Sequence, residues 1–213
     1  MNEGTVAAIV LAGGRSSRMG RDKAALVLDG RPLLLRTLDA VSAVAAEIVI
    51  VRAPGQSLPA LDGAPAARVV DDPVAGEGPL RGIATGLGAI TAPVAVVVGV
   101  DMPFLRPALL RLIAGRVSTE RRWVLPIASR RPQPLCSAFA RDALPVVLAH
   151  LAAGDRAPMA VAADLGFYRM PPEEWGAADP DGWSFVDVDT PEDFAEAERL
   201  LRDGGRPAVR EGR

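Results

Sequence analysis

The hydrophobic residues of this chain fall into short unbroken runs, a pattern typical of strands that are buried on both faces of a parallel sheet. The clearest runs are VAAIVL at 6–11 and VAVVVGV at 94–100, and neither contains a charged residue. Runs in the second half are less regular and predict strands that extend or cap the sheet. The predicted strands are 6–11, 47–51, 67–71, 94–100, 122–128, 135–140 and 167–170.

The segments between these runs carry apolar residues at the spacing of amphipathic helices. Three of them, at 31–44, 78–90 and 106–117, have a proline near the first turn, where its missing N–H costs no hydrogen bond. Thr190 can cap the last helix, with Pro191 as its first residue. Helices are therefore predicted at 31–44, 78–90, 106–117, 141–152 and 190–202, and a loop at 171–183.

Strands and helices alternate along the first half, which predicts a doubly wound α/β fold with a mostly parallel sheet and helices on both faces. No internal repeat interrupts this order. We expect one domain over residues 1–202 and a mobile tail at 203–213.

Composition narrows the class of protein. The chain has 213 residues, 49% of them hydrophobic, and a net charge of −2, so general attraction to nucleic acid or an anionic membrane is not expected. The longest apolar run, at 92–100, is far shorter than a membrane helix, and the start lacks the basic segment of a signal peptide. We expect a soluble cytoplasmic protein with no nucleic-acid or membrane partner.

Cys136 and His150 are the only residues of their types. A single cysteine excludes an internal disulfide. One cysteine and one histidine are also too few for a zinc site built from several Cys and His ligands. We predict structural roles for both: Cys136 packs in an apolar strand and His150 lies late in a helix.

The stretch LAGGRSSRMGRDKAAL at 11–26 leaves the first strand at the carboxyl edge of the sheet, where ligands bind in open parallel sheets. Gly13 and Gly14 can adopt positive φ, and their N–H groups could then form an anion-binding nest, with Arg18 and Lys23 neutralising further phosphate charge. Lys23 is the only lysine among 24 basic residues, and we expect it to be an exposed functional side chain. The loop suits a nucleoside triphosphate; the alternative is a solvated basic loop.

Two common phosphate motifs are absent from this stretch. The adjacent glycines do not fit G-x-G-x-x-G, and Lys23 is followed by alanine where a P-loop has serine or threonine. A dinucleotide fold and a Walker ATPase are therefore disfavoured.

Asp101 directly follows the apolar run at 94–100, where a carboxylate has no packing purpose. The end of this strand meets the same edge of the sheet as the loop at 11–26. Magnesium prefers one or two carboxylates together with phosphate oxygens, and Asp101 could supply one of them. The alternative is a turn residue or a cap for the next helix.

The chain resembles the nucleotidyltransferases that activate small phosphorylated molecules with a nucleoside triphosphate, and most closely the molybdenum cofactor guanylyltransferases. Five motifs carry the resemblance, in the family order and over most of the chain. They are LAGGRSSRMGRDKA at 11–24, VVDDPVAGEGPLRGI at 69–83, GVDMPFL at 99–105, RPQPLCSAFAR at 131–141 and VDVDTPEDF at 186–194.

The resemblance implies a Rossmann-like sheet and the transfer of GMP from GTP to the terminal phosphate of molybdopterin, with loss of pyrophosphate. It implies Mg²⁺, or Mn²⁺ in its place, on Asp101 with Asp189 as a second ligand. Catalysis would depend on Lys23, Arg18 and Asp101. The implied nucleotide contacts are Leu11, Ala12, Gly13, Gly14, Lys23, Asp72, Gly78 and Asp101, with Asp71 as the alternative to Asp72.

One motif departs from the guanylyltransferase pattern. Asp187 and Asp189 stand where the guanylyltransferases usually have asparagines, and related cytidylyl- and sugar nucleotidylyltransferases often have aspartate. We expect both residues to lie near the acceptor. The alternatives are a transferase that uses CTP or another triphosphate on molybdopterin or a sugar phosphate, and a non-catalytic protein that delivers nucleotide or cofactor. Molybdoenzyme apoproteins or delivery chaperones are the expected protein partners.

Overall fold

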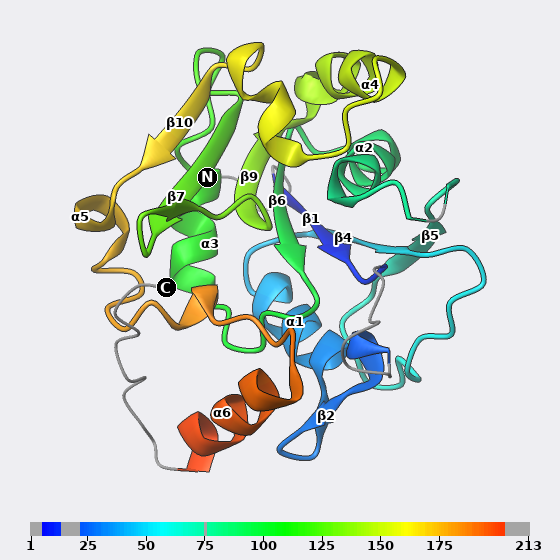
Figure 1. Cartoon of the computed structure of the whole chain (residues 1–213), viewed down its shortest axis with the longest axis vertical. Coiled ribbons are helices and arrows are strands. Elements are labelled where there is room, and N and C mark those ends of the chain that lie inside the picture. Colours follow the sequence, from blue (N-terminus) through cyan, green and yellow to red (C-terminus); the bar gives the residue numbers. More distant parts are fainter. Residues whose placement is uncertain (1–5, 14–21, 75, 203–213) are drawn as a thin grey trace.

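The computed structural model describes residues 6–13, 22–74 and 76–202. Its larger sheet has the strand order β10-β7-β9-β6-β1-β4-β5, with β8 paired to β7 (Figure 1). The strands are β1 (Val6–Leu11), β2 (Val27–Leu28), β3 (Arg31–Pro32), β4 (Glu47–Arg52), β5 (Arg68–Asp71), β6 (Val94–Gly99), β7 (Trp123–Ala128), β8 (Arg131–Pro132), β9 (Cys136–Ala140) and β10 (Phe167–Met170).

The helices alternate with these strands as the sequence pattern predicts. The α-helices are α1 (Leu33–Ser42), α2 (Pro79–Ala89), α3 (Pro107–Ala114), α4 (Leu144–Ala152), α5 (Pro172–Trp175) and α6 (Pro191–Arg202), and the 3-10 helices are η1 (Lys23–Ala25), η2 (Arg141–Ala143), η3 (Pro158–Ala163) and η4 (Trp183–Phe185). No helix in the described part of the chain is long and apolar enough to cross a membrane.

The predicted mostly parallel sheet is confirmed, with β9 and the two-residue strand β8 reversed. Strands β5, β4, β1 and β6 run parallel, whereas β9 is antiparallel to both of its neighbours, β6 and β7. A short connection through β8 links β7 to β9, so no crossover helix is needed between them. An apolar run does not encode strand direction, which is why the pattern alone could not show this reversal.

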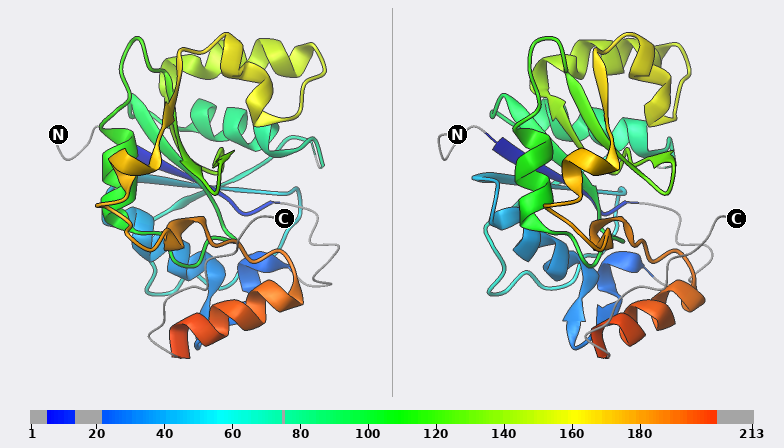
Figure 2. Two further views of the ribbon diagram at one scale, coloured as in Figure 1. Left: turned by 60° about the vertical axis from the view of Figure 1, so that its left-hand side comes forward. Right: turned by 90° about the vertical axis from the view of Figure 1, so that its left-hand side faces the viewer.

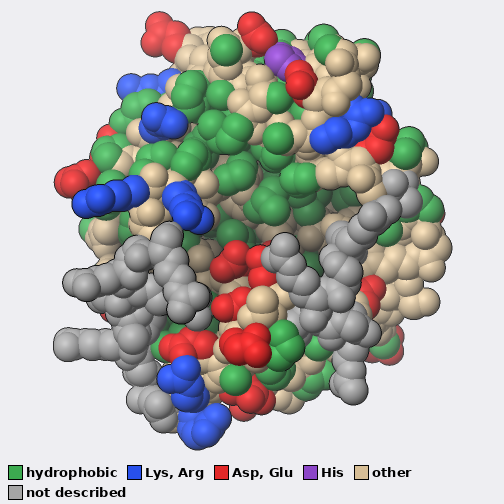
Figure 3. All heavy atoms as spheres, in the orientation of Figure 1, with side chains coloured by type: hydrophobic (Ala, Val, Ile, Leu, Met, Phe, Trp, Pro, Cys, Tyr) green, Lys and Arg blue, Asp and Glu red, His purple; other side chains and the backbone are tan. Residues whose placement is uncertain are grey.

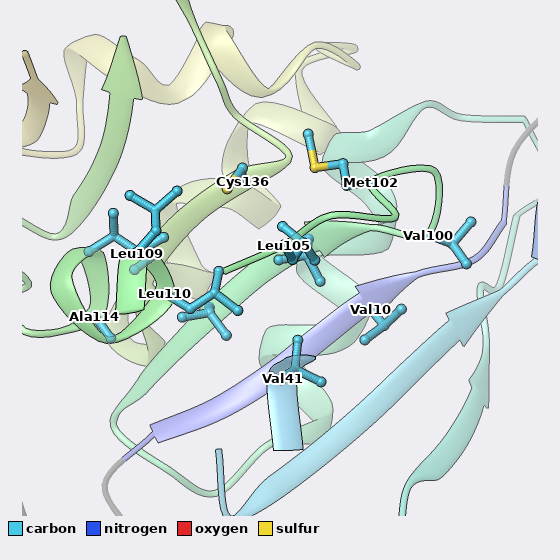
Figure 4. Packing of buried hydrophobic residues seen from close by; sticks show 14 of the residues in the cluster. Val10, Val41, Val100, Met102, Leu105, Leu109, Leu110, Ala114 and Cys136 are labelled. Carbon is cyan, nitrogen blue, oxygen red and sulfur yellow. The ribbon is translucent and has the colours of Figure 1, made fainter. Parts of the chain in front are cut away.

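Two layers of helices cover the sheet, because alternate residues of each strand face opposite sides. In β1, Val6, Ala8 and Val10 belong to the cluster that packs against α1 and α3. Ala7, Ile9 and Leu11 belong to the cluster under α2 and α4. Figure 2 shows these two helical layers, and Figure 4 shows the α1–α3 side of the core from close by.

The C-terminal helix α6 packs outside these layers, against β2 (Figure 2). A third cluster joins the two through Leu28, Val188 and Leu200. Thr190 caps this helix as predicted: its hydroxyl accepts from the Asp193 N–H at 3.2 Å, and the Asp193 carboxylate accepts from the Thr190 N–H at 3.0 Å.

The segment 171–183, predicted as a loop, contains the single helical turn α5. Its consecutive prolines and four-residue length give no helical periodicity in the sequence, whereas burial of Trp175 fixes the turn against the sheet. The predicted tail at 203–213 lies outside the described residues.

Candidate functional site

The carboxyl ends of β1 and β6 lie side by side and form the floor of the candidate site. Leu11 pairs with Gly99 in the parallel ladder, and the Val100 N–H donates to the Leu11 carbonyl at 3.1 Å. Asp101 follows directly. Figure 3 shows acidic side chains gathered in the middle of this face, below a hollow with an apolar wall.

Lys23 joins the acidic residues of this edge. Its Nζ lies 2.8 Å from Asp101 Oδ2 and also donates to Asp189 Oδ1. The structure thus brings together three of the predicted site residues, from segments separated by 78 and 166 positions. The lysine side chain is only 16% exposed, so the expectation of an exposed side chain is wrong. The hydrogen bonds to the two carboxylates hold the ammonium group at the edge of the sheet, so little of the side chain is exposed.

The charge state of Lys23 follows from these contacts. Burial lowers the pKa of this ammonium, but the charge of Asp101 and the hydrogen bonds to Asp101 and Asp189 outweigh burial and raise the pKa above its ordinary value. The group is therefore a permanent cation at neutral pH.

Asp187 lies in the same acidic group. The Val188 N–H donates to the Asp101 carbonyl at 2.9 Å, which fastens the 187–189 segment beside β6. Val188 is buried against α6, and the residues on either side of it belong to the site. Burial and the charges of Asp189 and Asp101 raise the pKa of the Asp187 carboxyl.

Gly99 makes room for the Asp101 carboxylate, and sequence reasoning missed this role. A Cβ at residue 99 would lie 2.4 Å from Asp101 Oδ1, closer than any real contact allows. The carboxylate therefore folds back over the end of β6, where only glycine fits. A glycine that ends an apolar strand just before an acidic residue was the available signal.

The donor set of this edge fits magnesium. Oxygens of Asp101 and Asp189 already converge on one cationic atom, Lys23 Nζ, so both can reach a single cation. Among residues 6–13, 22–74 and 76–202, no three histidine, cysteine, aspartate or glutamate side chains are grouped to hold a metal by themselves. A site with two carboxylates, completed by phosphate oxygens and water, is the kind that Mg²⁺ favours and Zn²⁺ does not.

The start of the glycine-rich loop differs from the predicted anion nest. The N–H groups of Ala12 and Gly13 both donate to the Val51 carbonyl, at 2.8 and 3.2 Å, and Gly13 does not have a positive φ. The nest prediction is therefore wrong for Gly13. A Cβ there would lie 2.8 Å from the Ala53 nitrogen, so glycine is needed for close backbone packing. Gly14 and Arg18 lie outside the described residues.

Of the two neighbouring aspartates, Asp72 is the one that faces the inside of the molecule. Asp71 is exposed and pairs with Arg52 at 2.6 Å, whereas Asp72 is half-buried beside α2, with Oδ2 3.9 Å from where a Cβ on Gly82 would lie. Burial raises the pKa of the Asp72 carboxyl, and no described residue hydrogen-bonds its buried Oδ1. Asp72 therefore faces α2 and Asp71 faces solvent, and the contact of either residue with the nucleotide stays a prediction.

Gly78 has a conformational reason of its own. Its φ is +80°, and a Cβ would lie 3.0 Å from the Arg156 carbonyl oxygen, so this N-cap of α2 has to be glycine. Its predicted contact with the nucleotide stays a prediction.

Cys136 and His150 lie away from this chemistry, as predicted. Burial raises the pKa of the Cys136 thiol to about 12, which leaves it an unreactive core residue. His150 lies between Asp155 and Asp164, at 2.7 and 2.8 Å. Among the tryptophans, Trp123 and Trp175 are buried and Trp183 is partly buried, as expected for core or rim positions.

Comparisons with known proteins relate this site and fold to a family and to solved structures. The family model described as "MobA-like NTP transferase domain" matches residues 8–166. A probable molybdenum cofactor guanylyltransferase of Chloroflexus aggregans is 32% identical and covers 91% of this chain and 93% of its own length. A molybdenum cofactor guanylyltransferase of Desulfosudis oleivorans is also 32% identical, with 93% and 97% covered.

Solved structures share the fold. Molybdopterin-guanine dinucleotide biosynthesis protein A of Archaeoglobus fulgidus superposes with a TM-score of 0.74 at 24% identity, covering 92% of this chain and 99% of that one. The 2-C-methyl-D-erythritol 4-phosphate cytidylyltransferase of Thermus thermophilus gives 0.66 at 21% identity, covering 91% and 98%.

Proposed function

Because the chain belongs to the MobA-like NTP transferase domain family, we propose that it transfers GMP from GTP to the terminal phosphate of molybdopterin, releasing pyrophosphate. The observation that carries the proposal is the meeting of Lys23 with Asp101 and Asp189 at the carboxyl edge of β1 and β6. The names of the guanylyltransferase relatives support the choice of base and acceptor. We also propose that the product passes to a molybdoenzyme apoprotein or a delivery chaperone.

Asp101 and Asp189 are the residues that would hold Mg²⁺, or Mn²⁺ in its place, with Asp101 as the principal ligand. The ion would supply positive charge to the phosphates of the bound nucleotide. Asp101 suits this role for two reasons. Strand β6 fixes its backbone, and the missing Cβ of Gly99 leaves room for its carboxylate against the end of that strand.

The transfer needs charge neutralisation and positioning more than acid–base chemistry. An oxygen of the acceptor phosphate forms a bond to the α-phosphorus of GTP, and the bond from that phosphorus to the bridging oxygen breaks, so the electron pair leaves with pyrophosphate. A phosphate monoester has a second pKa near 6, so the attacking oxygen is already mostly ionised at neutral pH. Lys23 neutralises charge on the reacting phosphates, with Arg18 predicted to assist.

Asp187 and Asp189 would lie on the acceptor side. Their negative charges lie beside Asp101 and Lys23, so an anionic acceptor at this edge would depend on Lys23 and the metal ion for charge balance.

The test is pyrophosphate release from GTP, CTP and ATP in the presence of molybdopterin. We expect GTP to be preferred, and exchanging both Asp187 and Asp189 for asparagine to leave that preference unchanged, because this segment lies with the acceptor. A preference for CTP would favour the cytidylyltransferase alternative. Nucleotide binding without pyrophosphate release would favour a delivery protein.

Asp101→Asn tests the role of this carboxylate in the reaction, since asparagine keeps the shape of the aspartate side chain and removes its charge. We expect metal-dependent turnover to fall about 10³-fold, and the free energy of unfolding to change by less than about 1 kcal/mol because Lys23 keeps its contact with Asp189. Asp189→Asn should cost less turnover. Undiminished turnover in Asp101→Asn would remove this residue from the mechanism.

A further inference from the structure

We propose that Gln56, a residue outside every motif of the family resemblance, positions Lys23 for the reaction. The proposal rests on the function proposed above for Lys23, but its structural part can be tested without substrate. Gln56 lies in the loop after β4, and its side chain reaches from the end of β1 to the turn that carries Lys23.

A tight turn presents Gln56 at this place. The Gln56 N–H donates to the Ala53 carbonyl at 3.0 Å, and between them Pro54 is followed by Gly55 with φ +72°. Proline then glycine of positive φ at the two central positions is the sequence of a type II turn. The Arg52 guanidinium also donates to the Gln56 carbonyl, at 2.9 Å, so the backbone is held on both sides.

The side-chain amide of Gln56 uses all its hydrogen-bonding groups. Its Nε2 donates to the Ala12 carbonyl at 3.0 Å and to Asp22 Oδ2 at 2.7 Å, while Oε1 accepts from the Ala53 N–H at 2.9 Å. Two acceptors on one side and a donor on the other permit only this orientation of the amide. Glutamate has the same length but no hydrogen to donate, and asparagine is shorter by one methylene.

Asp22 transmits this constraint to Lys23. Its second oxygen, Oδ1, accepts from the Ala24 N–H at 2.9 Å, which makes Asp22 the cap of η1. Lys23 is the first residue of that single turn, and its carbonyl accepts from Leu26 at 3.1 Å. The turn is too short to hold itself together, so Gln56 and Asp22 set the direction from which Lys23 approaches Asp101.

The same amide also holds the residue that follows β1 in place, through the Ala12 carbonyl. In the sequence, Ala12 precedes the predicted site residues Gly13, Gly14 and Arg18, and Asp22 follows them. One side chain thus ties together the ends of two segments that the proposed reaction needs, from a position 44 residues from one and 34 from the other.

The test is an exchange of the two polar groups. Gln56→Glu and Asp22→Asn each break the Nε2–Oδ2 hydrogen bond, by placing two acceptors or two donors face to face. The double variant restores a donor–acceptor pair between residues 22 and 56 with the roles reversed, and asparagine still caps η1 through its oxygen. The hydrogen bond to the Ala12 carbonyl is lost in both proteins that carry Gln56→Glu, so these two proteins are compared with each other. Gln133→Glu is the matched control, because the Gln133 side chain makes only long hydrogen bonds of 3.4 Å, to the Ala128 and Arg131 carbonyls.

Two measurements are made on each protein. The first is kcat and KM for GTP. We expect each single variant to lose about tenfold in kcat with less than about a threefold change in KM, because a misplaced group costs rate rather than binding. The double variant should recover part of the loss seen in Gln56→Glu, since it regains the contact between residues 22 and 56 but not the one with Ala12. A double variant that is more active than Gln56→Glu is the signature of direct coupling.

The second measurement is the Cε signal of Lys23 at fixed pH, in protein labelled with ¹³C-lysine. The chain has one lysine, so there is one such signal. It should move in both single variants, return towards the wild-type position in the double variant, and stay unchanged in Gln133→Glu. If the protein does not use GTP, this result still stands. An unmoved signal in Gln56→Glu and Asp22→Asn, or a double variant no better than Gln56→Glu, would overturn the proposal.

Discussion

One ammonium group holds together the acidic residues of the candidate site. Lys23 contacts Asp101 and Asp189, and both contacts come from a side chain that is mostly buried. An arginine could not take this place without change, because its planar guanidinium is larger and donates in a fixed fork. A lysine at this position, in a chain whose other basic residues are all arginine, therefore fits the size and charge that the two carboxylates require.

Substitution of Lys23 should separate catalysis from folding. In Lys23→Ala we expect turnover to fall about 10²-fold, with a loss of about 1 kcal/mol in the free energy of unfolding, since two partly exposed ion pairs disappear. Lys23→Arg should remain impaired despite its charge. Turnover and urea unfolding measure the two effects, and a Lys23→Arg protein with wild-type turnover would show that only the charge matters.

At the scale of an element, substitution of two glycines of α2 should change the stability of the protein in opposite directions. A Cβ on Gly86 would lie 2.3 Å from Ile9 Cγ2, in the contact between α2 and β1, whereas a Cβ on the exposed Gly88 would meet nothing closer than 3.8 Å. We expect Gly86→Ala to destabilise the protein by about 2 kcal/mol through overpacking. Gly88→Ala should stabilise it by about 0.5–1 kcal/mol through helix propensity.

Urea unfolding of both variants measures this difference. Equal effects of the two substitutions would mean that α2 does not pack on β1 as closely as described. The helix also carries Gly78 at its N-cap, so the packing of α2 on the sheet also positions this predicted nucleotide contact.

Most elements could be predicted from the sequence because their periodicity is local. The apolar runs at 6–11 and 94–100 and the cap at Thr190 are signals within a few residues. The reversed direction of β9 has no such local signal, because both faces of that strand would be buried in either direction.

The site was predictable to the extent that its residues stand out in their own segments. Lys23 stands out by type, and Asp101 stands out by following an apolar strand. Gln56 and Gly99 act through contacts with residues that the fold brings to them, such as Ala12 and the Asp101 carboxylate. No pattern within their own segments marks such contacts.

At the scale of the whole molecule, His150 makes stability depend on pH. The hydrogen bonds to Asp155 and Asp164 raise the pKa of the imidazole above its ordinary value of about 6.5. A raised pKa in the folded state means that folding favours the protonated form. This stabilisation is fully present below about pH 6.5 and is lost as the pH rises through the folded-state value.

The comparison of wild type with His150→Gln isolates this contribution. We expect the wild type to be more stable than the variant near pH 5.5 and the difference to shrink towards pH 8.5, as measured by urea unfolding at each pH. A difference that grows with pH would show that the neutral imidazole is the favoured form. Turnover should depend on neither form, since His150 lies away from the acidic edge.

The place of β1 in the middle of the sheet has a consequence for synthesis of the chain. This strand leaves the ribosome first, yet one of its two hydrogen-bonded edges waits for β6, which begins more than eighty residues later. At translation rates of about 5–20 residues per second, that edge stays open for roughly 4 to 16 seconds. During this interval VAAIVL is an apolar strand with unpaired amides, which is the kind of segment that aggregates or recruits a chaperone. The strand that ends at the candidate site thus needs protection while the protein is being made.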